Sequence, residues 1–225
     1  LTFQFESTVI DYFIKTYQNG KTPNPCIICN QKIKFGVVLD YARKLKAQML
    51  ATGHYARVGK DKNNRYCLFS GKDKQKDQSY FLAFLKQSQV AISCFPVGDL
   101  TKAEVKKIAE KYALTPVNKG ESQDICFIKD KTYGEFLSSQ KGFKAKPGNI
   151  ENITGDAIGR HDGLHLFTIG QRRGIDCPAK HPYYVLRLDT KSNSLVVGHK
   201  KDLLADRCFI TGINWINNVL KHKVT

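Results

Sequence analysis

The sequence lacks any long hydrophobic run, and this absence argues against a membrane protein. No stretch approaches the roughly 18 consecutive apolar residues that a membrane-spanning helix requires. The opening segment, LTFQF, has neither the basic flank nor the small-residue cleavage site of a signal peptide. There is no internal repeat or low-complexity tract, and the first residue is not methionine. These absences predict a cytoplasmic globular protein whose sequence is entered part-way along the chain.

Acidic residues are scarce relative to basic ones. The chain has 20 Asp and Glu against 36 Lys and Arg, which gives a net charge of +16. Such a surplus attracts polyanions, because each neutralised phosphate releases condensed counterions. No basic amphipathic helix of the membrane-surface type stands out, so a nucleic acid is favoured over an anionic lipid as the partner. A lysine-rich surface without a polyanionic partner is the alternative interpretation.

The seven cysteines offer only one close pair, Cys26 and Cys29. An odd number at irregular spacing, without a secretory signal, argues against a disulfide framework and predicts a reducing compartment. A structural zinc site normally needs a second close pair, so half of a zinc knuckle is the less favoured interpretation. The single cysteines are Cys67, Cys94, Cys126, Cys177 and Cys208.

The first half of the chain has the pattern of a parallel α/β sheet. Apolar residues recur near a 3.6-residue period over 6–18 and 31–46, which predicts two amphipathic helices. A short apolar run at 49–51 then predicts a buried strand that ends near Gly53. Helix, strand and glycine turn in this order are typical of sheets that bind ligands at the carboxyl ends of their strands.

The elements that follow are predicted from shorter signals. A hairpin or mobile loop is expected over 59–76, a helix over 79–92 and a buried strand over 125–128. Thr101 and Glu104 form a capping pattern, which predicts the start of another helix. The buried stripe expected on that helix consists of Val105, Ile108, Ala109 and Tyr112.

Beyond residue 128 the composition changes, because glycine and proline become frequent. Alternating apolar and polar residues over 183–189 and 194–198 surround a Lys-Ser-Asn turn, which predicts a β-hairpin. Residues 208–215 have the composition of an opening strand of a further β unit. A second domain, mainly of β structure, is therefore expected here.

The cysteine pair has the setting of reactive thiols. Two prolines hold the backbone around Asn24, and Cys26 and Cys29 follow at the predicted start of a helix. A thiol at a helix N-terminus has a lowered pKa, because the helix dipole and unpaired N–H groups stabilise the thiolate. Cys126 follows a polar loop, where reactive groups often lie, but its apolar neighbours fit a buried core cysteine equally well.

Three further segments have weaker signals. Gly53, at a strand end, would let a nucleotide approach the backbone closely, although an ordinary turn glycine looks the same. His54 beside it is a candidate ligand contact or a core histidine. The segments 76–80 and 170–174 combine cationic and amide side chains that suit phosphate and base contacts, and solvated surface would look the same.

The sequence resembles a known family through an ordered set of motifs. These are TPNPCxxCNxxIKF at 22–35, ATGHYAR at 51–57, KDQSYFL at 76–82, FPVGDLTKAEVKKIA at 95–109, ESQDICFI at 121–128 and GLHLFTIGQRRG at 163–174. Together they are similar to the tRNA-specific 2-thiouridylases of bacteria and mitochondria, over nearly the whole chain. That family adenylates the C2 oxygen of the wobble uridine in certain tRNAs and then displaces the adenylate with sulfur.

The resemblance implies a fold and domain boundaries. Residues 1–128 would be the C-terminal part of a Rossmann-like N-type ATP-pyrophosphatase domain, of the adenine nucleotide alpha hydrolase-like class. Residues 129–203 would form a small, mainly β central domain that binds tRNA, and 204–225 the start of a C-terminal β-barrel. The glycine-rich SGGxDS phosphate loop would precede Leu1, and most of the barrel would follow Thr225. The chain alone is therefore expected to be inactive.

The resemblance also implies roles for individual residues. Cys126 matches the cysteine that carries sulfur as a persulfide, and Cys29 matches the nucleophile that attacks it or closes a disulfide with it. Gly53 matches a glycine that contacts ATP. The residues that would contact the target base are Asn24, Pro25 and Cys26. Those that would contact tRNA are Lys76, Asp77 and Gln78.

The cofactors and partners implied are ATP with Mg²⁺, the anticodon loop of tRNA, and a sulfur donor that is either a cysteine desulfurase or a sulfur relay protein. In one alternative, Cys26, Cys29 and Cys126 ligate an iron–sulfur cluster instead of passing a persulfide. Rival functions are a tRNA 4-thiouridine or 2-thiocytidine synthetase, an argininosuccinate-type ligase, and a non-catalytic RNA-binding module with structural zinc. The order of the three cysteines argues against the small-molecule ligases.

Overall fold

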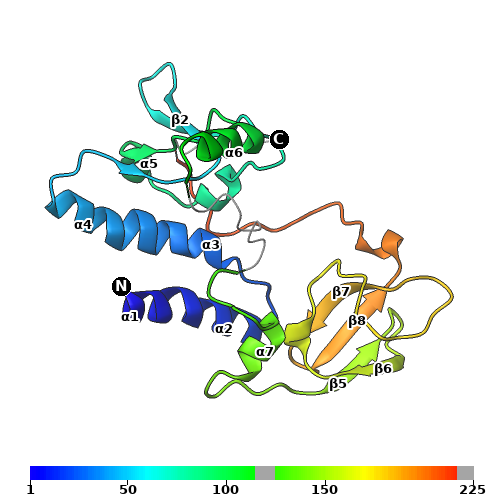
Figure 1. Ribbon diagram of the computed structural model, residues 1–225. Coiled ribbons are helices and arrows are strands. Elements are labelled where there is room, and N and C mark those ends of the chain that lie inside the picture. Colours follow the sequence, from blue (N-terminus) through cyan, green and yellow to red (C-terminus); the bar gives the residue numbers. More distant parts are fainter. Residues whose placement is uncertain (115–124, 217–225) are drawn as a thin grey trace. The chain divides into compact units, whose positions relative to one another are not determined.

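The computed structural model describes residues 1–114 and 125–216 (Figure 1). Its contacts divide the chain into two compact units. The first unit consists of Leu1–Val9, Pro25–Gln123 and Thr211–Thr225, and the second of Ile10–Asn24 and Asp124–Ile210. Over the described ranges, no helix combines the length and the apolar character needed to cross a membrane.

The two predicted N-terminal helices are confirmed, and both begin earlier than expected. The first runs without a break through α1 (Thr2–Phe5), the π-helical stretch η1 (Glu6–Ile10) and α2 (Asp11–Gln18). The second runs through α3 (Pro25–Ile28), the π-helical stretch η2 (Cys29–Val38) and α4 (Leu39–Lys44). Proline occupies the first helical position of α3, where its missing N–H is not needed. The cysteine pair therefore lies at the start of a helix, as predicted.

The described residues of the first unit form two small sheets. The strand predicted at 49–51 is confirmed as β1 (Leu50–Ala51), which pairs in parallel with β4 (Ser93–Cys94). The hairpin is confirmed as β2 (Ala56–Lys60) and β3 (Tyr66–Ser70), paired antiparallel. The predicted helix over 79–92 is reduced to two short pieces, η3 (Ser79–Leu82) and α5 (Gln87–Val90). The core of this unit consists of Phe35, Ala56, Leu82, Leu85, Val90 and Phe95.

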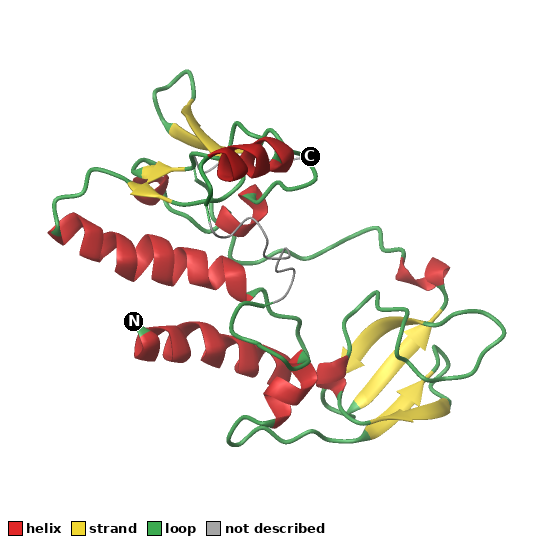
Figure 2. Ribbon diagram, in the orientation of Figure 1, coloured by secondary structure: helices red, strands yellow, loops and turns green. Residues whose placement is uncertain are grey.

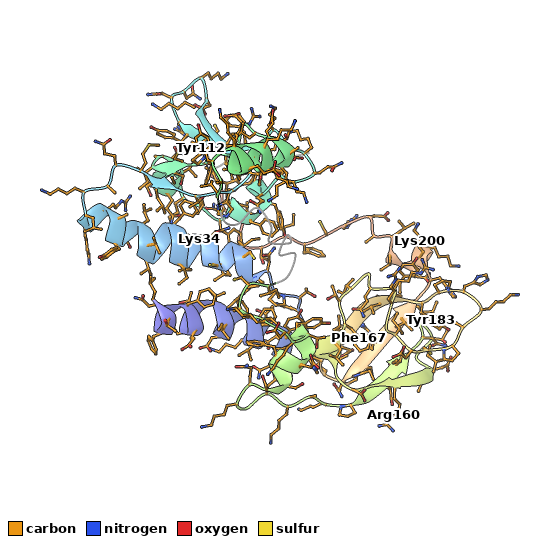
Figure 3. All side chains as sticks on the ribbon, viewed as in Figure 1. Lys34, Tyr112, Arg160, Phe167, Tyr183 and Lys200 are labelled. Carbon is orange, nitrogen blue, oxygen red and sulfur yellow. The ribbon has the colours of Figure 1, made fainter. Side chains whose placement is uncertain are left out.

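Helix α6 (Lys102–Lys111) begins as predicted but does not bury the expected stripe. Thr101 Oγ1 accepts a hydrogen bond from the Glu104 N–H at 3.2 Å, and Glu104 Oε2 accepts one from the Thr101 N–H at 2.6 Å. However, Ile108 and Tyr112 are 43% and 67% exposed, and Tyr112 lies at the end of α6 (Figure 3). The prediction of a buried stripe was wrong because periodicity fixes which residues share a face, not whether another element covers it.

Two predicted strands are not strands in the structure. Residues 125–128 form a turn, in which the Ile128 N–H donates to the Ile125 carbonyl at 2.9 Å. Its apolar side chains pack against helix α2 instead of joining a sheet, which is why a strand was wrongly predicted. Residues 208–215 are irregular, and the Asn214 side-chain amide donates to the carbonyls of Ala83 and Leu85, at 2.9 Å each.

The second unit contains one sheet of four strands in the order β6-β5-β8-β7. Strands are drawn in yellow in Figure 2. Its strands are β5 (Gly148–Glu151), β6 (Ala157–His161), β7 (Tyr184–Asp189) and β8 (Ser194–Gly198). The predicted hairpin is confirmed, with β7 and β8 antiparallel around a turn in which Asn193 has a φ of 55°. The sheet buries Ile150, Val185, Leu195 and Val197 completely.

The remaining helices of this unit are α7 (Tyr133–Ser138) and the 3₁₀ turns η5 (Leu164–Leu166) and η6 (Lys200–Leu203). A second core cluster joins α7 to α2 through Leu137, Phe13 and Tyr17. Phe13 contacts Tyr17 edge-on, with ring centroids 5.0 Å apart. The predicted mainly β character of the second half is therefore confirmed. In addition, helices α7 and α2 pack together beside the sheet's own core cluster.

The close packing at Gly98 gives a test of the first unit. A Cβ at this buried position would overlap the carbonyl oxygen of Ala56, so Gly98→Ala is expected to lower the free energy of unfolding by about 1–3 kcal/mol. Urea denaturation followed by the fluorescence of Trp215, the single tryptophan, measures the change. Gly53→Ala is the control, because its added methyl meets nothing within 4 Å. Equal stability of the two variants would contradict the packing.

Candidate active site

Gly53 lies just beyond the carboxyl end of β1, where parallel sheets bind ligands. The residue is exposed, and a Cβ built on it would find no heavy atom within 4 Å. Its φ is not positive, so the backbone here does not itself require glycine. Glycine therefore leaves open space beside this turn, which a bound molecule can occupy.

His54 belongs to the core of this turn. Its side chain is 8% exposed, its Nδ1 is 2.8 Å from Thr52 Oγ1, and its ring lies 5.9 Å from that of Phe95, edge-on. Burial, with a smaller contribution from Lys34, lowers the pKa of His54 to about 4. The ring is therefore neutral at pH 7. Its contacts with Thr52 and Phe95 stabilise the turn, which favours the interpretation of His54 as a core histidine.

The segment 76–78 is hydrogen-bonded to Tyr55, the residue after His54. The Gln78 N–H donates to the Tyr55 carbonyl at 2.9 Å, and the Tyr55 N–H donates to Gln78 Oε1 at 3.1 Å. Asp77 holds its own loop, since its carboxylate accepts from the Gly71 N–H at 2.7 Å and from Ser79 Oγ at 2.8 Å. Burial opposes the ionisation of Asp77, but these hydrogen bonds prevail and lower its pKa. The two side chains therefore fix the loop beside the Gly53 turn.

Cys26 and Cys29 lie in the first two turns of the helix that begins at Pro25. Cys26 is exposed and Cys29 is half-buried. The next residue, Asn30, is 2% exposed and its Nδ2 donates to the Phe81 carbonyl at 2.9 Å. The helix that carries both thiols is thus tied to the segment that follows Gln78.

Sequence reasoning missed the anchoring role of Asn30. Asparagine is unfavourable inside helices, because its side chain competes for backbone hydrogen bonds. An asparagine directly after Cys29, within a predicted helix, was the signal that could have revealed it.

Cys126 lies in the turn 125–128 and is exposed. The neighbouring Phe127 packs edge-on against Phe13, with ring centroids 5.4 Å apart, so the turn is anchored while the thiol faces solvent. The buried-core interpretation of Cys126 was therefore wrong. Cys26 and Cys29 belong to the first unit and Cys126 to the second, so the meeting of these thiols stays a prediction.

The other residues expected at the site lie as follows. Asn24 is half-buried, and its N–H donates to the Tyr12 hydroxyl at 3.4 Å, while Pro25 is buried. Gln171 is used within its own loop, since its side chain accepts from the Thr168 N–H at 3.0 Å and donates to the Arg173 carbonyl at 2.9 Å. Within 1–114 and 125–216, no three His, Cys, Asp or Glu side chains gather closely enough to hold a metal ion.

Comparison with known proteins identifies the family. A profile of the tRNA methyl transferase HUP domain matches residues 1–130, and one of the tRNA methyl transferase PRC-barrel domain matches 134–199. The tRNA-specific 2-thiouridylase MnmA of Desulfosudis oleivorans is 49% identical over 212 residues, which cover 94% of this chain and 59% of that protein. The chain belongs to the tRNA-specific 2-thiouridylase family.

Other 2-thiouridylases give the same result. The enzyme MnmA of Geotalea uraniireducens is 46% identical, over 95% of this chain and 57% of its own length. MnmA 2 of Syntrophus aciditrophicus is 43% identical, over 96% and 64% respectively. The chain thus spans about three fifths of the length of these 2-thiouridylases.

Family membership confirms the predicted fold class, because the HUP domain is a Rossmann-like nucleotide-binding fold and a PRC-barrel domain follows it. The boundaries expected for the three domains of this 2-thiouridylase-family chain stay predictions. The same holds for the catalytic, base-binding and tRNA-binding roles of the individual residues.

The buried His54 predicts a pH dependence of stability. The pKa of His54 is about 4 in the folded chain and 6.5 in the unfolded chain. Between these pH values only the unfolded chain binds the proton, and this binding stabilises the unfolded state. The contribution of His54 to the free energy of unfolding should therefore fall as the pH drops, by about 2 kcal/mol between pH 7 and pH 5. Denaturation curves recorded by Trp215 fluorescence across this range measure it. His54→Gln should remove this contribution and make the dependence on pH shallower, and an unchanged slope in this variant would refute the assignment.

Proposed function

We propose that this chain is part of an enzyme that replaces the C2 oxygen of the wobble uridine in tRNA with sulfur. The observation that carries the proposal is its identity of 43–49% to proteins named tRNA-specific 2-thiouridylase, over 94–96% of the chain. The charge of +16 supports a polyanionic substrate, and the Rossmann-like fold supports a nucleotide.

ATP is the proposed activating substrate, with Mg²⁺ as its counterion. The C2 oxygen of uracil is a poor leaving group, and its adenylation creates a good one, AMP. The open space beside Gly53, at the carboxyl end of β1, supports this glycine as a contact of the nucleotide. The loop held by Gln78 and Asp77 lies next to this turn, so these residues would shape the surface that meets tRNA, with Lys76 supplying positive charge.

The sulfur would come from a persulfide on Cys126. A donor, either a cysteine desulfurase or a relay protein, loads the outer sulfur, and the exposure of the Cys126 thiol supports its access. The outer sulfur attacks C2 of the adenylated base, and AMP leaves with the former C2 oxygen. The Cys29 thiolate then attacks the inner sulfur, which releases the thiolated base and forms a disulfide between the two cysteines. The electron pair that reduces the transferred sulfur comes from these two thiols, and cellular thiols restore them.

Three further contacts complete the proposed site. Extrusion of the wobble uridine from the anticodon stack would bring it to Asn24, Pro25 and Cys26. Cys26 is exposed and can meet the base, whereas the buried Pro25 would fix the backbone. A cytoplasmic location fits this substrate and the reducing step. If an iron–sulfur cluster replaced the persulfide, Cys26, Cys29 and Cys126 would be its ligands, and purified protein would contain stoichiometric iron.

Replacement of Cys126 tests the proposal. With Cys126→Ala introduced at the gene's own locus, the wobble 2-thiouridine of cellular tRNA should fall at least 100-fold, because the sulfur carrier is lost. Mass spectrometry of digested tRNA measures it. The matched control is Cys208→Ala, which removes another exposed thiol and should leave the level unchanged. Unaltered 2-thiouridine with Cys126→Ala would refute the proposal, and loss of 4-thiouridine or 2-thiocytidine instead would favour the rival synthetases.

Gly53→Ala tests the nucleotide contact. The added methyl finds free space in the protein, so the stability should not change, but it would collide with a nucleotide packed against the backbone. We expect the KM for ATP to rise about 10-fold, an apparent loss near 1.4 kcal/mol, in the thiolation assay of the full-length enzyme that carries the substitution. An unaltered KM for ATP would contradict this role, and a lowered unfolding midpoint would contradict the free space found at Gly53.

A further inference from the structure

The second unit has a cavity of about 390 Å³ that the proposed reaction does not use. Its lining residues come from the end of α2, the loop between α7 and β5, the turn η5 and the turn between β7 and β8. Figure 1 labels α2, α7, β5, β7 and β8. Its lining consists of Tyr17, Gln18, Gly20, Gly142, Phe143, Lys144, Lys146, Leu164, His165, Thr190 and Asn193. This volume is within the range of sites that hold small ligands or parts of larger ones.

The lining carries positive charge and no carboxylate. Lys144 and Lys146 are both exposed at its edge, and the segment 141–146 has the sequence KGFKAK, with three lysines. The opposite side, the turn after β7, adds Lys191 next to Thr190. The one acidic group of that turn, Asp189, accepts hydrogen bonds from the N–H groups of Lys191 and Ser192, at 3.0 and 3.2 Å. An anion in the cavity would therefore meet cations first.

The end of helix α2 does not repel an anion strongly, although helix C-termini carry partial negative charge. The last carbonyls are occupied within the chain: those of Lys15, Thr16 and Tyr17 accept from the N–H groups of residues 19, 21 and 20, at 3.0–3.1 Å. The Asn19 side-chain amide also donates to the Lys15 carbonyl, at 2.8 Å. These contacts leave the lysines as the dominant charges.

The cavity has a fixed wall. Asn193 Nδ2 donates to the carbonyls of Lys146 and Pro147, at 3.2 and 2.8 Å, which fixes the end of the lysine loop against the sheet. His165 is 6% exposed, and its ring contacts Phe143 edge-on, with centroids 4.9 Å apart. Burial and the nearby His161 lower the pKa of His165, so its ring is neutral at pH 7 and carries one N–H. A buried polar ring with exposed lysines at the rim offers the cationic and hydrogen-bonding groups that contact backbone phosphates.

We propose that this cavity binds a phosphate group of the RNA backbone, with Lys144 and Lys146 as its cationic ligands and His165 in its wall. The inference rests on the proposed function only in naming RNA as the substrate. A backbone phosphate is common to all RNAs, so the site would contribute affinity and orientation without reading sequence.

The test measures how RNA affinity depends on salt. Fluorescence anisotropy gives the Kd of this chain for a tRNA and for poly(U) at several salt concentrations. Each lost phosphate contact should reduce the slope of log K against log salt by about 1. Lys144→Gln with Lys146→Gln should therefore reduce the slope by about 1–2 and weaken binding roughly 10-fold near physiological salt, for both RNAs.

The matched control is Lys200→Gln with Lys201→Gln. It removes the same charge from exposed lysines of the same unit, in η6, away from the cavity lining. Equal loss of slope in both double variants would mean general attraction by net charge and would overturn the proposed site. An unchanged slope in the cavity variant would overturn it as well.

Inorganic phosphate gives a second, independent measurement. Titration of the chain with phosphate should shift the NMR signals of the His165 ring, and the cavity variant should abolish this shift, whereas chloride at equal ionic strength should not cause it. Absence of a shift in the unaltered chain would count against the site. Neither binding measurement depends on sulfur transfer. A negative binding result would therefore leave the test with Cys126→Ala unaffected, and an unaltered 2-thiouridine level in that test would leave the binding measurements unaffected.

Discussion

The candidate site in the first unit depends above all on the pairing of Gln78 with Tyr55. Two hydrogen bonds, one from each backbone N–H, hold the loop of 71–79 beside the turn that contains Gly53 and His54. Tyr55 is buried and His54 is packed against Phe95, so the turn itself is rigid. A nucleotide at Gly53 and an RNA at the loop would thus meet surfaces whose mutual position is fixed. Binding to such a preorganised surface loses less conformational entropy.

Local signals in the sequence were sufficient for much of the fold. The capping pair Thr101 and Glu104, the proline at the start of α3 and the turn at Asn193 act over a few residues, and all three are confirmed. The failures depended on distant packing. Residues 125–128 have the apolar composition of a strand, but they pack against helices. Ile108 lies at the helical spacing of a buried stripe and yet is exposed.

The candidate site was also predicted only in part, because sequence signals are local and several of its contacts are not. The helical position of Cys26 and Cys29 and the open space at Gly53 follow from neighbouring residues. The internal roles of Asp77 and Asn30 do not follow from neighbouring residues. Asp77 binds the N–H of Gly71 in its own loop, and Asn30 binds the carbonyl of Phe81, 51 positions away. The cavity of the second unit was also beyond sequence reasoning, since its lysines, histidine and asparagine come from separate segments of the chain, two of which meet where β5 pairs with β8.

The apolar stripe of α6 affects how molecules of this chain behave toward one another. Ile108 and Tyr112, with Leu114 beyond the helix, expose apolar surface along one side. At low ionic strength the charge of +16 keeps molecules apart by repulsion. Salt shortens the Debye length to about 3 Å at 1 M, so this repulsion vanishes while apolar attraction remains. We therefore expect attraction between exposed apolar side chains of neighbouring molecules to gain weight as the salt concentration rises.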